Sequence, residues 1–490
     1  MERRTIGVQV GRGSRRRRAS IALVVLVGAL SLAASVYGGS VIATPISSDP
    51  YTNASSQHRT QLEPDSFGYG NTVVATFQTG RFFDGGASNI GWATTTNAGR
   101  TWTTGMLPGT TVYEGGPWAR ISDPAVAYDP AHNVWMISTL AIDSNVSGAA
   151  VLTHRSTDGG LTWGPPIETS VSSGTFYDKN WITCDTWAQS PYYGHCYQEW
   201  DDSRLTMSTS TDGGLTWGTP KFPGGSGIGG QPVVQPDGTV VVAYEGGAGI
   251  RAFRSEDGGN TWLSSVAVQP GSEHGVAGNL RTSPLPSAEV AGDGRVFVAW
   301  QDCAFRSGCT SNDIVYSTSM DGVAWTAKQR VPIDATNSGV DHFIPGFAVD
   351  RASSGSTTRL ALGYYYYPVA NCSSATCQLT VGFTSSTDNG ATWTQSQKVA
   401  GPISLADIAS TNQGVMVGDY MSTSFAGGNF AFPIFAVAKH KTGSTFDERA
   451  YSARFDVTVP SARRIPARKD PILFHRNNLR PEVEPPLPVP

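Results

Sequence analysis

Polar and charged residues recur where the predicted β-strands of this chain begin or end, which are positions from which side chains can converge on a shared centre. Carboxylates there could act in pairs as acid and base, as Asp123 and Asp178 would, and basic groups could hold an anion. A solvent-filled centre would also tolerate such residues without any chemistry. The strand starts carry Glu63, Asp123, Asp178, Lys179, Gln231, Arg281, His342 and Asp419. The ends of second strands carry Gln78, Arg81, Asp201, Asp202, Arg204, Glu245 and Asp302.

Five of the carboxylates are suitable hard ligands for a cation, although no contiguous calcium-loop pattern surrounds them. They are Asp178, Asp201, Asp202, Asp302 and Asp313. The sequence contains no G-x-S-x-G elbow, no Walker loop, no H-E-x-x-H and no dinucleotide fingerprint. We therefore expect no cofactor, and a structural cation is the one addition left open.

A repeated sequence motif indicates the β-strands that must position these residues. The nine residues STDGGLTWG occur at 156–164 and again at 210–218. Because a fixed motif recurring along a chain is typical of arrayed units, the repeat predicts an array of similar sheets. Weaker copies are TTNAGRTW ending at Trp102, SEDGGNTW ending at Trp262, SMDGVAW ending at Trp325 and STDNGATW ending at Trp393.

Each residue type in the motif suits a tight hairpin. The Asp or Asn oxygen can accept hydrogen bonds from backbone NH groups of the turn, and Gly supplies the positive φ. The closing Trp returns to the apolar layer and anchors the hairpin. The copy at Asp321 is one residue shorter, so a tighter turn is expected there.

On these motifs the chain resembles the Asp-box (BNR) repeat family, in which the box joins the two outer strands of a propeller blade. β-like runs precede every box, and a seventh set at 416–457 has no box after it. The resemblance implies an all-β fold, a β-propeller with seven blades, with six as the alternative. The missing outer strand of the last blade is expected from the segment around Ser55 to Leu62.

Sialidases share the boxes and the propeller, and they use a Tyr nucleophile, an Asp acid/base and three arginines around a substrate carboxylate. The stretch QTGRFFDGGASNIGW resembles their loop after the first long strand, which places Asp84 as acid/base and Arg81 nearby. Tyr420, with Asp419 beside it, is the candidate nucleophile, and the tyrosines at 364–367 are the alternative. The substrate-binding candidates are Arg81, Arg281, Arg204, Asp123, Asp178 and His342, with Arg306 as a further arginine.

The match departs from that family at its first arginine, which lies in an Arg-Ile-Pro motif. The corresponding stretch here is Leu62-Glu63-Pro64, and Arg120-Ile121 is followed by Ser122 instead of proline. Asp84 can equally be an ordinary turn residue in a Gly-rich loop, and runs of tyrosine are common in strand packing.

The two ends of the 490-residue chain differ from its middle. Residues 1–43 carry seven Arg and one Glu before an uncharged run from Ala19 to Val36, which predicts a signal peptide or an N-terminal membrane anchor. Without them the formal charge of −4 becomes −10, which argues against nucleic acid as a partner. The propeller is expected over 44–460, and the Pro-rich tail 461–490 is expected to be disordered or a spacer.

The six cysteines fall into three close pairs, which in an exported chain predict local disulfides. No His or Cys cluster has the spacing of zinc ligands. The expected pairs are Cys184 with Cys196, Cys303 with Cys309, and Cys372 with Cys377.

Two functions follow from the sequence, with a different polysaccharide hydrolase or lyase that uses paired acids such as Asp123 and Asp178 as a third possibility. One is a secreted or cell-surface glycoside hydrolase of exo-α-sialidase type, acting as a monomer on terminal acidic sugars of extracellular glycans or glycoproteins. The other is a propeller without catalytic activity that binds glycan or protein at the same funnel.

Overall fold

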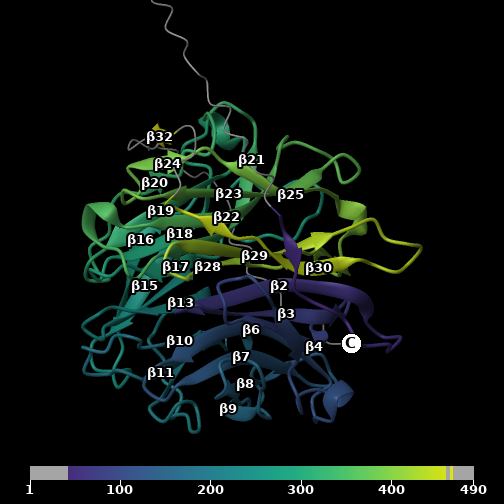
Figure 1. The fold of residues 1–490 in the computed structure, drawn as a ribbon, viewed down its shortest axis with the longest axis vertical. Coiled ribbons are helices and arrows are strands. Elements are labelled where there is room, and N and C mark those ends of the chain that lie inside the picture. Colours follow the sequence, from purple (N-terminus) through teal and green to yellow (C-terminus); the bar gives the residue numbers. More distant parts are fainter. Residues whose placement is uncertain (1–41, 203, 459–463, 467–490) are drawn as a thin grey trace, which may run out of the picture. The chain divides into compact units, whose positions relative to one another are not determined.

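The structure is a computed structural model that describes residues 42–202, 204–458 and 464–466, all within the compact unit Ser40–Pro490. Strands dominate these residues, and the all-β class predicted from the sequence is confirmed (Figure 1). The helices in the described ranges are four single turns of 3-10 helix, none of which has the length that crossing a bilayer requires. They are η1 (Val112–Glu114), η2 (Ser307–Cys309), η3 (Gly355–Thr357) and η4 (Leu405–Asp407).

The described strands form seven groups of consecutive antiparallel strands, here called sheets one to seven. Sheet one holds β2 (Gln57–Tyr69), β3 (Thr72–Arg81), β4 (Ala87–Thr95) and β5 (Thr103–Met106). Sheet two holds β6 (Arg120–Asp129), β7 (Val134–Ile142), β8 (Gly148–Ser156) and β9 (Ile167–Val171). Sheet three holds β10 (Asp178–Cys184), β11 (Cys196–Asp201) and β12 (Leu205–Ser210).

The remaining sheets follow the same plan. Sheet four holds β13 (Ile228–Val234), β14 (Val240–Glu245), β15 (Gly249–Ser255) and β16 (Leu263–Pro270). Sheet five holds β17 (Ser287–Val290), β18 (Val296–Asp302), β19 (Asp313–Ser319) and β20 (Gln329–Arg330). Sheet six holds β21 (Asp341–Val349), β22 (Leu360–Tyr367), β23 (Gln378–Ser386) and β25 (Gln397–Ser404). Sheet seven holds β28 (Ser422–Ala426), β29 (Phe430–Ala438) and β30 (Glu448–Ser452).

The first strands of the seven sheets contact one another in cyclic order. β2 contacts β6, and the series continues through β10, β13, β17, β21 and β28 back to β2. Apolar clusters lie between successive sheets; one joins Val241 of β14 to Trp300 of β18. The seven first strands therefore surround a common centre.

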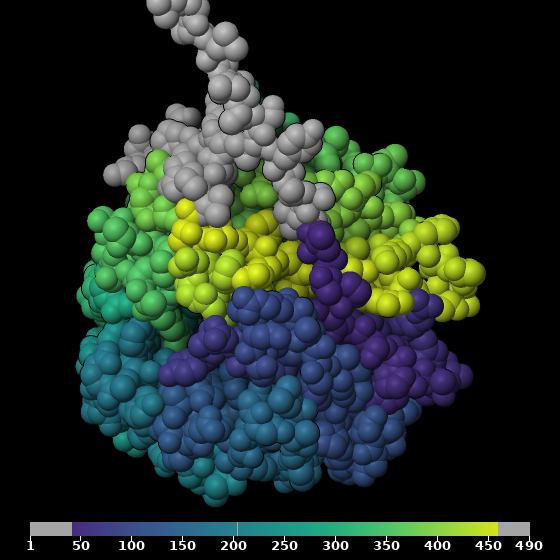
Figure 2. Space-filling model, viewed as in Figure 1, coloured from purple at the N-terminus to yellow at the C-terminus, as the bar shows by residue number. Residues whose placement is uncertain are grey.

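Sheet seven is completed by the beginning of the described chain. β1 (Thr44–Pro45) pairs antiparallel with β30, and the backbone NH of Ile46 donates to the carbonyl of Ala450. Figures 1 and 2 show the purple residues lying against the yellow strands. The expected donor segment, Ser55 to Leu62, instead enters β2, the first strand of sheet one, and meets β30 at one parallel pair, Thr60 with Glu448.

The Asp boxes form the predicted hairpin turns. In the box at 156–164, Asp158 Oδ1 accepts the backbone NH groups of Leu161 and Thr162, each at 3.0 Å. Ser156 Oγ accepts the NH of Gly160, which has a φ of 82° and lies so close to Val74 of sheet one that a Cβ would stand 2.6 Å from it. The shorter copy places the NH groups of Val323 and Ala324 on Asp321, as the tighter turn requires.

All three predicted disulfides are present. Cys184–Cys196 joins facing positions of β10 and β11, while Cys303–Cys309 and Cys372–Cys377 close loops. Such bonds are typical of proteins from oxidising compartments.

Three short strands between residues 392 and 415 lie outside the seven sheets. They are β24 (Thr392–Thr394), β26 (Ser410–Thr411) and β27 (Gly414–Val415). β31 (Phe455–Asp456) pairs antiparallel with β29 of sheet seven. Within the tail expected to lack structure, β32 (Arg464–Pro466) pairs antiparallel with β24. The predicted signal peptide or anchor and the rest of the tail lie outside the described residues, apart from Ile42 and Ala43.

Candidate functional site

A repeated backbone irregularity turns side chains toward the centre of the ring of first strands. The pairing register shifts near the start of β2, β6, β10, β13 and β21. At these shifts Glu63, Asp123 and Lys179 have positive φ values of 54°, 46° and 47°. Residues with side chains rarely adopt such values, and β-bulges that re-aim a side chain are common beside functional sites. In β13 and β21 the equivalent residues are Gly229 and Ile344.

Three acids and three bases meet at this centre. The acids are Glu63, Asp123 and Asp419, and the bases are Arg81, Lys179 and Arg281. The side chains of Lys179, Asp123 and Asp419 are at most 6% exposed, and that of Arg281 is 14% exposed. A buried charge requires an opposite partner, and Asp123 and Asp419 supply it to Lys179 and Arg281.

Asp419 is the anion that two cations share. Arg281 binds it with two donors, Nε at 2.7 Å from Oδ1 and Nη2 at 2.6 Å from Oδ2. Lys179 Nζ also donates to Asp419 Oδ2 and lies 3.7 Å from Asp123 Oδ1. The guanidinium of Arg281 reaches Gln413 as well. A bidentate guanidinium–carboxylate pair is among the strongest polar contacts in proteins.

Glu63 and Arg81 are linked through Gln78 of β3. Gln78 Nε2 donates to the Glu63 carboxyl group and lies 3.1 Å from Ser122 Oγ, while Arg81 Nη1 donates to Gln78 Oε1 at 2.9 Å. Glu63 Oε1 also accepts the backbone NH of Asp419 at 3.2 Å. Arg81 Nε is buried and has no hydrogen-bond partner among the described residues.

The two neighbouring carboxyl groups of this centre have opposite pKa shifts. Burial raises the pKa of Glu63 to about 8, and the charges of Asp123 and Asp419 add to the rise. Burial also opposes ionisation of Asp419, but Arg281 and Lys179 outweigh it and hold the pKa of Asp419 well below its usual range. At neutral pH Glu63 is therefore protonated and Asp419 is ionised.

Tyr420, the predicted nucleophile, adjoins the cluster. Its hydroxyl group donates to the carbonyl of Pro124 at 3.1 Å, and its ring meets Trp181 edge to face at 5.0 Å between centroids. Burial raises the pKa of the Tyr420 hydroxyl well above its ordinary value. The phenol is neutral here, and its role as nucleophile stays a prediction.

Asp84, the predicted acid/base, lies on the loop after β3 with its side chain half exposed. It forms an ion pair with Arg120, whose guanidinium stacks over the Phe82 ring at 4.2 Å. Partial burial works against ionisation of Asp84, but Arg120 outweighs it, so the pKa of Asp84 is lowered. Its catalytic role also stays a prediction.

A cavity borders the charged cluster. Lys179 and Asp419 line it together with apolar groups, among them Trp181, Leu285 and Met421. Tyr420 and Gln231 also line this cavity, so a ligand there would meet charged and apolar surfaces at once.

The other residues selected from the strand ends make contacts of their own outside the charged cluster. Arg204 is half exposed, faces Asp202 and covers the Phe222 ring at 3.4 Å. Asp178 pairs across the strands with Asp201, whose Oδ2 accepts the NH of Gly229 at 3.0 Å. Glu245 accepts the NH of Gly247. Asp302 forms a buried ion pair with Lys328 at 2.7 Å.

His342 belongs to a separate buried network with Asp313 and Asp334. One potential ligand atom of each residue lies within 4.8 Å of those of the other two, which is close enough for the three to share a metal ion. Arg330 lies 2.7 Å from Asp313 and 2.6 Å from Asp334, and Arg306 contacts the same two carboxylates. Because two guanidiniums already neutralise these carboxylates, the residues fit a structural ion-pair network better than a cation site.

Sequence reasoning missed two features of the centre. Gln413, which binds Arg281, follows no recognisable motif. Glu199 faces Trp181 across the strands and has a fully buried carboxyl group; burial raises its pKa well above the usual range, and the charge of Asp201 and a hydrogen bond with it add to the rise. Glu63 and Asp123 are each followed directly by proline, in Leu62-Glu63-Pro64 and Ser122-Asp123-Pro124. This shared acid–proline pair was the sequence signal from which the two bulges could have been predicted.

Comparisons with known proteins gave matches at the level of structure alone. No protein-family model and no curated protein sequence matches the chain. A protein of unknown function from Dyadobacter fermentans is similar over 71% of this chain and 100% of its own, with 15% identity and a TM-score of 0.44. An α-L-arabinofuranosidase from Fusarium graminearum, solved with an iminosugar inhibitor, is similar over 86% and 99%, with 11% identity and a TM-score of 0.45.

An intramolecular trans-sialidase from Ruminococcus gnavus, solved with oseltamivir carboxylate, is similar over 84% of this chain and 97% of its own, with 13% identity and a TM-score of 0.40. At such identities the activity of the present chain does not follow from these likenesses.

Proposed function

We propose that residues 44–460 form an Asp-box propeller of seven blades that acts outside the cell as a glycoside hydrolase of exo-α-sialidase type. The cyclic contacts of the seven first strands support seven blades. The three disulfides support export, because such bonds persist in oxidising compartments. The proposed substrates are terminal acidic sugars of extracellular glycans, taken by a monomer.

One observation carries this proposal: Arg281 and Arg81 meet at the centre of the ring, where Arg281 already holds a carboxylate with two donors. Asp419 presents to Arg281 the planar anion that the carboxylate of an acidic sugar would present. The unpartnered Nε of Arg81 adds a donor for such an anion. A ligand carboxylate would thus compete with Asp419 for Arg281.

The proposal keeps Tyr420 as nucleophile and Asp84 as acid/base, and each would have to leave its present partner to act. The Tyr420 hydroxyl must leave the carbonyl of Pro124 to attack, and Asp419, which is ionised, is the neighbouring carboxylate proposed to accept its proton. Asp84 must be released from Arg120 to move a proton. Ligand binding would have to drive both changes.

A second candidate is a propeller that binds glycan without cleaving it. It is favoured by the engagement of both predicted catalytic groups, Tyr420 with Pro124 and Asp84 with Arg120. The acid Glu63, at the position of the first arginine in sialidases, favours it too.

The deciding experiment is release of 4-methylumbelliferone from its sialic acid conjugate, with glycan-array binding measured on the same protein. Tyr420→Phe and Asp84→Asn should each lower turnover at least a hundredfold while Arg281→Gln abolishes binding as well. Matched controls are Tyr193→Phe and Asp237→Asn, which change exposed residues that are not part of the cluster. Binding without turnover would favour the second candidate, and the absence of both would refute the proposal.

A further inference from the structure

The loop that brings Arg281 to the centre is a long connection between sheets four and five. Residues 271–286, here called the strap, join β16 to β17 without forming a strand. At its far end the NH of Arg281 donates to the carbonyl of Val415 at 2.8 Å, and the NH of Val415 donates to the carbonyl of Asn279 at 2.9 Å. The position of Arg281 therefore depends on how the strap is held.

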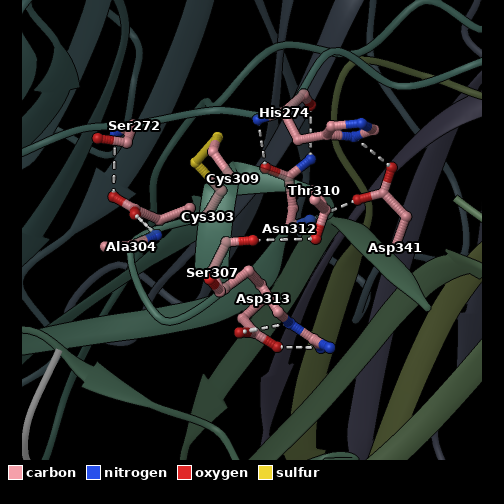
Figure 3. Close-up of a disulfide and its surroundings, with 12 residues drawn as sticks. Ser272, His274, Cys303, Ala304, Ser307, Cys309, Thr310, Asn312, Asp313 and Asp341 are labelled. Atoms are coloured by element: carbon pink, nitrogen blue, oxygen red, sulfur yellow. Dashed lines mark hydrogen bonds and ion pairs between the residues drawn. A yellow bond between two sulfur atoms is a disulfide. The ribbon is translucent and has the colours of Figure 1, made fainter. Parts of the chain in front are cut away.

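The near end of the strap is fixed to sheet five. The NH of Ser272 donates to Asp302 Oδ2 at 3.2 Å, and the NH of Cys303 donates to the carbonyl of Ser272 at 2.9 Å. Gln301 Nε2 donates to the carboxylate of Glu273. Figure 3 shows Ser272 beside the Cys303–Cys309 disulfide, which closes the loop that follows β18.

The same end of the strap is also held by Asn312 and Asp341, which both contact His274. The NH of His274 donates to Asn312 Oδ1 at 2.8 Å, and Asn312 Nδ2 donates back to the carbonyl of His274 at 2.7 Å. The His274 ring lies 3.1 Å from Asp341 Oδ2 through Nδ1, and Asp341 Oδ1 accepts the NH of Asn312 at 2.6 Å. Figure 3 shows these contacts as one continuous network.

We propose that His274, Asn312 and Asp341 form a latch that positions Arg281, and that protonation of His274 closes this latch. The assignment of Arg281 as a ligand contact rests on the proposed function, but the latch itself does not. His274 is a positioning residue, since it acts through the strap and reaches Arg281 only along the backbone.

The charges around His274 determine whether the latch tightens or loosens as the pH changes. Asp341 is fully buried on β21, so its charge is stabilised most by a charged partner. The hydrogen bond to Asp341 raises the pKa of His274 against the opposing effect of burial, and the charges of Asp341 and Glu273 add to the rise. Those two carboxylates and the Asn312 and Asn371 amides face the ring among the described residues.

Because folding raises the pKa of His274, the ion pair is complete below the ordinary histidine pKa of about 6.5 and is lost as pH rises through the folded value. Neutral imidazole can still donate from Nδ1, but the contact then lacks the charge. The strap should accordingly be held tightly in mild acid and more loosely in mild alkali.

The test is hydrogen–deuterium exchange of the strap in the intact protein, measured from pH 5.5 to 8.5 and corrected for the intrinsic exchange rate. In the wild type, protection of residues 271–286 should fall about three- to tenfold across this range. In His274→Gln, the strap should be protected as weakly at every pH as the wild-type strap is at pH 8.5. The fall in protection with pH, here called the step, should therefore be absent. Asp341→Asn, which keeps an acceptor and removes the charge, should also lose the step.

The matched control is His132→Gln, because His132 forms an ion pair with the fully buried Asp129 on sheet two. This variant should keep the wild-type step. A His274→Gln or Asp341→Asn profile identical to that of the wild type would overturn the latch. An intact step in a protein that binds no sugar would refute the proposed function and leave the latch standing.

Discussion

Lys179 and Asp419 form a buried ion pair although 240 positions separate them in the sequence. Lys179 lies on sheet three, whose neighbours are sheets two and four, and Asp419 leads into sheet seven. The pair therefore joins sheets that do not adjoin in the ring, and the contact of Trp181 with Tyr420 does the same. The centre is held together by contacts across it as well as around it.

Replacing Lys179 by Met should destabilise the protein by about 3–5 kcal/mol, the usual cost of removing one partner from a buried ion pair. Asp419 would keep Arg281 but lose its second cation, and Asp123 would lose a neighbouring positive charge. Urea unfolding followed by tryptophan fluorescence measures the change. Lys398→Met removes an exposed lysine and should shift the midpoint little; an equal effect of both variants would contradict this role of the pair.

Arg281→Lys should weaken binding of an acidic sugar at least tenfold while the fold is retained. Lysine keeps the positive charge but cannot present the two parallel donors with which Arg281 holds a carboxylate. Isothermal titration with sialic acid measures the affinity, and Arg254→Lys, at a surface ion pair with Glu256, is the control. Unchanged affinity in Arg281→Lys would remove Arg281 from the proposed site.

Glu63→Gln should make stability less dependent on pH between 6 and 9. Folding raises the pKa of Glu63 to about 8, so the folded state retains a proton that the unfolded state has already released. The stability from this group is complete below the ordinary pKa near 4.3 and is lost as pH rises through about 8, with a limiting slope of about 1.4 kcal/mol per pH unit. Thermal unfolding across this range should show a flatter profile in Glu63→Gln, and parallel profiles would contradict the shift.

Asp158→Ala should lower the free energy of unfolding by about 1–2 kcal/mol, because two backbone NH groups and two hydroxyl groups of the turn lose their acceptor. Slight burial opposes ionisation of Asp158, but hydrogen bonds from Thr162, Ser156 and Leu161 outweigh it and lower its pKa to about 2. The stabilisation is present above the unfolded pKa near 3.9 and is lost as pH falls through about 2.

The difference in melting temperature between Asp158→Ala and the wild type should therefore become smaller as the pH is lowered from 5 to 2. Asp237→Ala removes a turn residue that accepts a backbone hydrogen bond from Thr239, and it should have the smaller effect. A difference that stays constant down to pH 2 would show that the charge of Asp158 contributes nothing.

The features that the sequence predicted well are local ones. An Asp box is a turn closed by its own side chains, so Ser156, Asp158 and Gly160 specify it within a few residues. The cysteine pairs are similarly close in sequence. The outer strand of sheet seven was placed wrongly, because Thr44–Pro45 is too short for a strand pattern and its partner Ser452 lies at the other end of the domain.

The candidate site was predicted only in part, because some of its contacts join residues that are far apart in the sequence. Arg281, Arg81 and Asp419 were selected from strand ends, and the structure brings them together. Their pairing with Lys179 and Gln413 depends on contacts across the ring, which no local pattern encodes. His342 was selected by the same rule, but the register of β21 places it against Tyr366 and in the Asp313 network.

The pairing of Thr44 with Ser452 also sets an order for biosynthesis. Each hairpin with an Asp box can form soon after its residues leave the ribosome, whereas β1 must wait until β30 has been made, more than 400 residues later. Until then the β30 edge of sheet seven is open to pairing with other chains. Closure of the ring through β1 therefore requires almost the whole of the described chain to have been made.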